Sequence, residues 1–64
     1  MLRTKLIILI NGWQVKPVDS DKLTSMTDND VTGVFNIFDK DGILIRDNRM
    51  ITIPVHSIVL TEYE

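Results

Sequence analysis

The stretch TKLIILINGWQVKPV, residues 4–18, decides the fold, because two segments that suit β-strands flank the dipeptide Asn11-Gly12. Asn-Gly is a strong local signal for a β-hairpin, since both central residues of a type I′ turn have positive φ. The sequence therefore predicts two antiparallel strands, Thr4–Ile10 and Trp13–Val18. Pro17 cannot donate a hydrogen bond to a neighbouring strand, so the second strand is expected to end or bulge there.

The length of this turn sets the register of the hairpin. A two-residue turn would pair Ile10 with Trp13, Ile8 with Val15 and Leu6 with Pro17, and these six residues would share the face that packs into the core. The opposite, half-polar face would then carry Lys5, Ile7, Leu9, Gln14, Lys16 and Val18. On this register Ile7 and Leu9 are expected outside the core, covered by another part of the chain or by a partner.

The remainder of the chain also favours β structure. The sequence lacks Ala and is rich in Ile, Val and Thr, whose branched side chains suit a pleated sheet. Further strands are expected at Val31–Phe38, Ile43–Arg46, Met50–Ile53 and Ile58–Glu62, with turns at 39–42 and at Asp47-Asn48 and a 3₁₀-like turn at 55–57. Five short strands with close turns should curl into a small barrel, so residues 1–64 are predicted to form one all-β domain.

The polar stretch 19–30 is the longest expected loop. It is rich in Asp, Ser and Thr. One short helical turn around Lys22–Met26, capped by Ser20, is also compatible with it, with Leu23 and Met26 facing inward. Its Asp residues are expected to keep the loop soluble rather than to bind a metal ion.

Composition limits the possible functions. The chain has 64 residues, a net charge of −2 and no Cys, so thiolate metal sites and disulfides are excluded. The apolar run Leu6–Ile10 is too short for a signal-peptide core or a membrane span. We expect a cytoplasmic protein without a membrane segment, metal or cofactor. Strong general attraction to nucleic acid is not expected, but a local basic patch remains possible.

Three segments resemble the Sm-like family, and among its members most closely the bacterial RNA chaperone branch, Hfq. They are Ile8-Leu9-Ile10-Asn11-Gly12, the segment from Gly33 to Asp39, and the segment from Ile53 to Val59. This resemblance implies a five-stranded Sm-like or SH3-like barrel that forms a homo-oligomeric ring and binds RNA. The family has a helix before its first strand, whereas this sequence begins almost at the first expected strand, and it carries Pro54-Val55-His56 where the family has Tyr-Lys-His.

Candidate residues follow from this resemblance and from residue type. For nucleic-acid binding they are Trp13, Asp39, Lys40, Arg46 and His56. For an oligomer interface they are Ile7, Leu9, Val59 and Tyr63, because these apolar side chains exceed the needs of so small a core. Trp13 can instead anchor the core, and His56 can be an ordinary surface residue. No nucleophile can be assigned to the single histidine, so an enzyme is not expected.

The sequence therefore supports two alternative hypotheses about function. The first is a non-catalytic, oligomeric, Sm-like module that binds RNA or single-stranded nucleic acid. The alternative is a protein-interaction module, such as an inhibitor or accessory factor of bacteriophage or other mobile-element origin.

Overall fold

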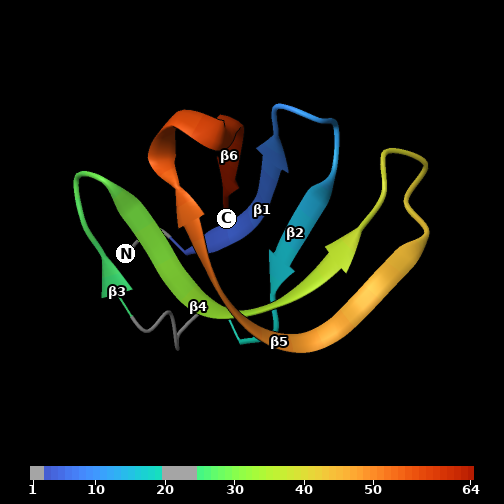
Figure 1. The fold of residues 1–64 in the computed structure, drawn as a ribbon. Helices are drawn as coiled ribbons and strands as arrows, with labels where there is room; N and C mark the ends of the chain where they lie inside the picture. Colours follow the sequence, from blue (N-terminus) through green and yellow to red (C-terminus); the bar gives the residue numbers. More distant parts are fainter. Residues whose placement is uncertain (1–2, 20–24) are drawn as a thin grey trace.

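The computed structural model describes residues 3–19 and 25–64, and it confirms an all-β fold with one 3₁₀ turn. The elements in chain order are β1 (Thr4–Leu9), β2 (Gln14–Pro17), β3 (Ser25–Met26), β4 (Asp30–Phe38), β5 (Leu44–Pro54), η1 (Val55–Ser57) and β6 (Ile58–Tyr63). They form a strongly curled antiparallel half-barrel of five strands plus the short β3 (Figure 1).

The strands follow the order β6-β1-β2-β4-β5 across the sheet. The short β3 lies beside the first half of β4, where Met26 pairs with Val31. The chain passes from β5 through η1 directly into β6, so the two strands that border the sheet are consecutive in sequence. This connection brings the two ends of the curled sheet toward each other.

The core lies inside the curl. Its buried members are Ile7, Val15, Val31, Phe35 and Ile53, each at most 5% exposed. In β4, buried residues alternate with half-buried ones, as expected for a strand with one face on the core. Four of these five residues are β-branched, which agrees with the composition that favoured a sheet.

The predicted register of the first hairpin is wrong by one residue. The loop has three residues, because the Leu9 carbonyl accepts the Gly12 N–H at 2.9 Å and the Leu9 N–H donates to the Trp13 carbonyl at 2.9 Å. Gly12 has φ +88°, so this is a turn followed by a left-handed glycine rather than a two-residue turn. Ile7 therefore pairs with Val15, and a shift of one residue moves Ile7 to the core face.

The predicted turn at Asp47-Asn48 is also wrong. The two expected strands on either side of it form the single strand β5, which pairs along the whole of β4. Asn48 has φ +51°, and its N–H donates to the Asn36 side-chain oxygen at 3.1 Å. The Asp-Asn pair thus makes a bulge, since Asn tolerates the left-handed region that a bulge needs.

The other local predictions have mixed outcomes. The end of β2 at Pro17, the turn at 39–42, the 3₁₀ turn at 55–57 and the last strand are confirmed. The expected helical turn at Lys22–Met26 falls largely on residues 20–24, outside the described residues. At its end, Ser25–Met26 is a short strand rather than part of a helical turn, and Met26, at 56% exposed, is not part of the buried core.

Candidate functional site

Three connections meet at one end of the half-barrel. The Ile10 N–H in the β1–β2 turn donates to the Ser57 carbonyl of η1 at 2.9 Å. On the other side of the same turn, a Cβ added at Gly12 would lie 3.3 Å from the Lys40 Cβ of the β4–β5 turn. Figure 1 shows η1 and both turns along the upper edge in that view. We call residues 10–13, 39–42 and 55–57 the turn rim.

The two hairpin turns of the rim have the same construction. In the second, the Asp39 N–H donates to the Ile43 carbonyl and the Gly42 N–H donates to the Asp39 carbonyl, at 2.9 and 3.0 Å. The Asp39 Oδ1 also accepts the N–H groups of Asp41 and Ile43, at 2.8 and 3.0 Å. Asn11 plays a similar part in the first turn, where its Oδ1 accepts the Trp13 N–H at 2.9 Å. Short polar side chains thus hold both turns in shape.

Four of the five residues predicted to bind nucleic acid lie on the turn rim. Lys40 and His56 are exposed, Trp13 is 39% exposed and Asp39 is half-buried. Arg46 lies outside the rim, on β5, where it pairs with Ile37 and its Nη1 donates to the Ile45 carbonyl at 2.9 Å. The fold therefore gathers residues that are up to 43 positions apart in the sequence, Trp13 and His56.

A cation–aromatic pair beside the rim was missed by sequence reasoning. The Lys16 Nζ lies 5.1 Å from the centre of the Phe38 ring, a distance typical of a cation–π contact. The pair depends on the alignment of β2 with β4, in which Gln14 pairs with Phe38. The alternation of residues along a strand predicts which face each side chain lies on. It does not predict how β2 aligns with β4, because these strands are distant in sequence.

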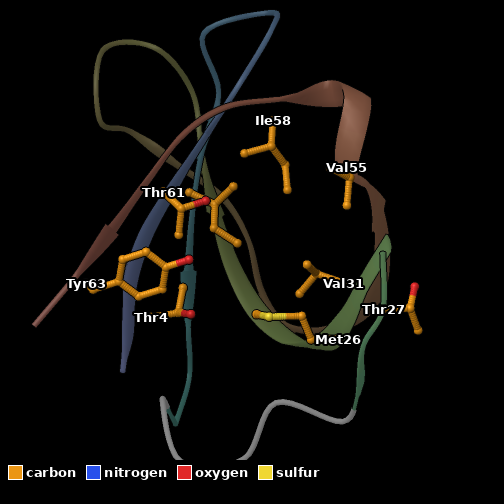
Figure 2. Close-up of a pocket in the computed structure, with 9 residues that line it drawn as sticks. Thr4, Met26, Thr27, Val31, Val55, Ile58, Thr61 and Tyr63 are labelled. Atoms are coloured by element: carbon orange, nitrogen blue, oxygen red, sulfur yellow. The ribbon is translucent and has the colours of Figure 1, made fainter. Parts of the chain in front are cut away.

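A second feature is a pocket of about 230 Å³ inside the open side of the half-barrel. In Figure 2, Thr61 and Tyr63 of β6 line one side, and Val31 and Val55 line the opposite side. The full lining consists of Thr4, Ile7, Met26, Thr27, Val31, Val55, Ile58, Thr61 and Tyr63. These side chains are apolar or carry a hydroxyl group, and none is charged.

The four residues predicted for an oligomer interface separate into two groups. Ile7 is 1% exposed and Leu9 packs against the core. The expectation that they lie on an outer face is therefore wrong, because the β1–β2 hairpin is shifted by one residue from the predicted register. Val59 and Tyr63 are on β6 and are 64% and 50% exposed. Within the described residues, β6 pairs with β1 alone, so these two lie on a strand that borders the sheet.

Many other large apolar side chains are also exposed. Besides Val59 and Tyr63 they are Ile10, Trp13, Val18, Met26, Ile43, Leu44, Met50, Val55 and Leu60. Single exposed apolar residues are ordinary on a protein surface, but their number is large for a chain of 64 residues. Some of these exposed apolar residues lie on the turn rim and others on β5 and β6, the strands that border the sheet.

Within residues 3–19 and 25–64, no group of three or more His, Asp or Glu side chains is placed to hold a metal ion. In the same part of the chain, no helix is long and apolar enough to cross a membrane. Comparison of this chain with protein-family models, with curated proteins and with solved structures finds no match.

Proposed function

We propose that this protein is a non-catalytic, Sm-like barrel that self-associates and binds RNA or another single-stranded nucleic acid at the turn rim. The observation that carries the proposal is the gathering of Trp13, Lys40 and His56 on three connections at one end of the barrel. An exposed aromatic ring beside basic side chains is the usual equipment for contacting unstacked bases and their phosphates.

The charges of the rim favour a modest affinity for nucleic acid, to which base stacking contributes more than contacts to phosphates. Stacking of a base on an aromatic ring contributes about 1–3 kcal/mol per base. The rim carries Lys40 but also Asp39 and Asp41, so few phosphates can be neutralised there. If Lys40 and one further cation each contact a phosphate, the logarithm of the binding constant should fall with the logarithm of salt concentration at a slope of about −1.4.

The strand order supports the Sm-like part of the proposal. The first and last barrel strands, β1 and β6, pair with each other, and a 3₁₀ turn that contains His56 precedes the last strand. The resemblance of the sequence segments implies a ring in such a fold. The bordering strands support self-association independently, because an exposed apolar strand at the edge of a sheet offers unpaired backbone groups to another chain.

The test is fluorescence anisotropy of labelled U-rich and A-rich 12-mers at low salt. We expect Lys40→Ala and His56→Ala to weaken binding, and Lys5→Ala to leave it unchanged, because Lys5 is exposed on β1 outside the rim. Circular dichroism checks that each variant keeps its β fold. Absence of binding at low salt, or equal loss for all three variants, would contradict the proposal.

A protein-interaction module is the second candidate, and the pocket beside β6 favours it. That pocket lacks charged lining residues and adjoins a bordering strand, features that suit an extended peptide more than a nucleic acid. Failure of every RNA in the anisotropy test would make this the leading function.

A further inference from the structure

Four hydroxyl groups lie on the lining of the pocket, and they belong to Thr4, Thr27, Thr61 and Tyr63. The Thr27 hydroxyl is used within the fold, because its Oγ1 accepts two backbone N–H groups of its own turn at 3.1 and 3.0 Å. Within residues 3–19 and 25–64, the hydroxyls of the other three residues form no side-chain hydrogen bond. They are therefore available to a ligand.

Thr4 is the most informative of these three residues, because it is buried. It is 3% exposed, and a bulge between Thr4 and Leu6 turns it to the same inner side as Ile7. In the described part of the chain, every fully enclosed side-chain oxygen or nitrogen has a hydrogen-bond partner. Since the Thr4 hydroxyl has none there, it is not fully enclosed by protein, and it opens into the pocket that Thr4 lines.

The three free hydroxyls share one wall of the pocket. Thr4 and Tyr63 pair across β1 and β6, and Thr61 lies on the same side of β6 as Tyr63. Figure 2 shows the three side chains along one side of the space, with Val31 and Val55 on the opposite side. A ligand in this pocket would meet a polar wall on one side and an apolar wall on the other.

We propose that the pocket binds a small neutral ligand of the phenol class, a single six-membered ring whose hydroxyl group bonds to Thr4 on the polar wall. This inference goes beyond nucleic-acid binding at the turn rim and does not depend on it. The pocket lining and the turn rim have only Val55 in common.

The volume of the pocket suits one ring. An engineered apolar cavity of roughly 150 Å³ binds benzene, whereas pockets for drug-sized ligands occupy roughly 300–1,000 Å³. At about 230 Å³, this pocket lies between the two and has room for a ring with one or two small substituents. The flexible thioether of Met26 also lets the lining adjust to the shape of the ring.

The lining favours a neutral ligand over a charged one. None of its nine side chains is charged. Moving a carboxylate out of water without a charged partner is strongly unfavourable, whereas a neutral hydroxyl only exchanges hydrogen bonds to water for hydrogen bonds to protein. The pocket should therefore distinguish phenol from benzoate, although the two rings are alike.

An NMR titration of the ¹⁵N-labelled protein with phenol near pH 7 tests the site. A phenolic hydroxyl has a pKa of about 10, so phenol is neutral under these conditions. We expect saturable shifts at the backbone amides of Thr4, Val31 and Thr61, and none with benzoate. Phenol shifts confined to the turn rim, or benzoate binding as tight as phenol binding, would overturn the proposal.

Thr4→Val tests the hydrogen bond, because valine keeps the branched shape and removes the hydroxyl. Loss of one hydrogen bond should weaken phenol binding by about 2- to 12-fold, and should not weaken the binding of toluene, which has no hydroxyl. Thr52→Val is the matched control, since Thr52 is exposed on β5 and its hydroxyl bonds to that of Thr32 at 2.9 Å, outside the pocket.

Thr61→Val is a second variant of the same wall, for use if circular dichroism shows that Thr4→Val does not fold. Phenol binding that is unchanged in a folded variant of Thr4 and in Thr61→Val would overturn the assignment of a hydroxyl-bearing ligand.

A tyrosine side chain of a partner protein has the same ring chemistry as free phenol, and N-acetyltyrosinamide distinguishes the two sources. We expect it to bind more weakly than phenol, because a pocket of about 230 Å³ leaves no space for its two amide groups beside the ring. Tighter binding of N-acetyltyrosinamide would overturn the free ligand in favour of a protein partner. The anisotropy test with RNA reports on the turn rim and is judged separately.

Discussion

Ile7 of β1 and Val15 of β2 lie directly opposite each other, and their exposed fractions are 1% and 0%. This pair distinguishes the three-residue loop of the first hairpin from a two-residue turn, in which Ile8 would occupy the place of Ile7. The register of the hairpin therefore decides which of two adjacent isoleucines belongs to the core.

The first prediction compares these two isoleucines. Ile7→Val removes a methyl group from the core and should lower the free energy of unfolding by about 0.5–1.5 kcal/mol, a large share of the roughly 3–10 kcal/mol expected for a domain of this size. Ile8→Val, at a half-buried position, should cost less. Urea unfolding at equal protein concentration measures both changes. A larger loss for Ile8→Val would favour the two-residue turn.

This register could not be read from the sequence, although the hairpin could. Asn11-Gly12 marks the turn correctly, but both a two-residue loop and a three-residue loop place glycine at a position of positive φ. The apolar run Leu6–Ile10 fills both faces of β1, so its pattern does not favour one register. In β4, by contrast, the buried Gly33 and Phe35 alternate with half-buried neighbours, two of them polar, so the core face follows directly from the alternation.

The second prediction concerns the two glycines that close the hairpin turns. Both have positive φ, +88° at Gly12 and +84° at Gly42. A Cβ at Gly12 would also crowd the Lys40 Cβ at 3.3 Å, whereas a Cβ at Gly42 would meet nothing within 4 Å. Gly42→Ala should cost about 1–2 kcal/mol from backbone strain alone, and Gly12→Ala should cost more.

Thermal unfolding of the two alanine variants, with Gly42→Asn as a control, measures this difference. Asn tolerates the left-handed region, so Gly42→Asn should be milder than Gly42→Ala. Equal losses for Gly12→Ala and Gly42→Ala would show that the two turns do not press against each other.

The third prediction separates structure from binding at Asp39. The sequence placed this residue among those that contact nucleic acid, but its Oδ1 accepts two backbone N–H groups within its own turn. Asp39→Ala should destabilise the fold by about 1–3 kcal/mol, and Asp39→Asn, which keeps an oxygen acceptor, by less. Chemical unfolding checks both variants. If Asp39→Ala unfolds at the same urea concentration as the wild type, Asp39 does not stabilise its turn.

The fourth prediction concerns assembly through β6. Val59→Asp places a charge on an exposed position of the bordering strand and should dissociate the homo-oligomer. Val18→Asp is the matched control, since Val18 is 45% exposed but lies outside β5 and β6. Light scattering should give a multiple of the 7.3 kDa chain mass for the wild type and for Val18→Asp. A 7.3 kDa wild-type particle at tens of micromolar would refute self-association.

The candidate site was only partly predictable. Residue type and the segment resemblance pointed to Trp13, Lys40 and His56, and the fold places all three on one rim. Arg46 was grouped with them only because it is basic, and the structure places it on β5, outside the rim. The Lys16–Phe38 contact and the pocket depend on non-local strand pairing, which sequence patterns of single strands do not encode.

The most direct test of the central proposal is a ¹H–¹⁵N NMR titration with a U-rich or A-rich single-stranded RNA at low salt. The chain has one Trp and one His, so the Trp13 indole N–H and the resonances of His56 are unambiguous reporters of the rim. We predict shifts concentrated at Trp13, Lys40 and His56 that weaken as salt is raised. A spectrum that does not change, or shifts confined to β5 and β6, would contradict nucleic-acid binding at the turn rim.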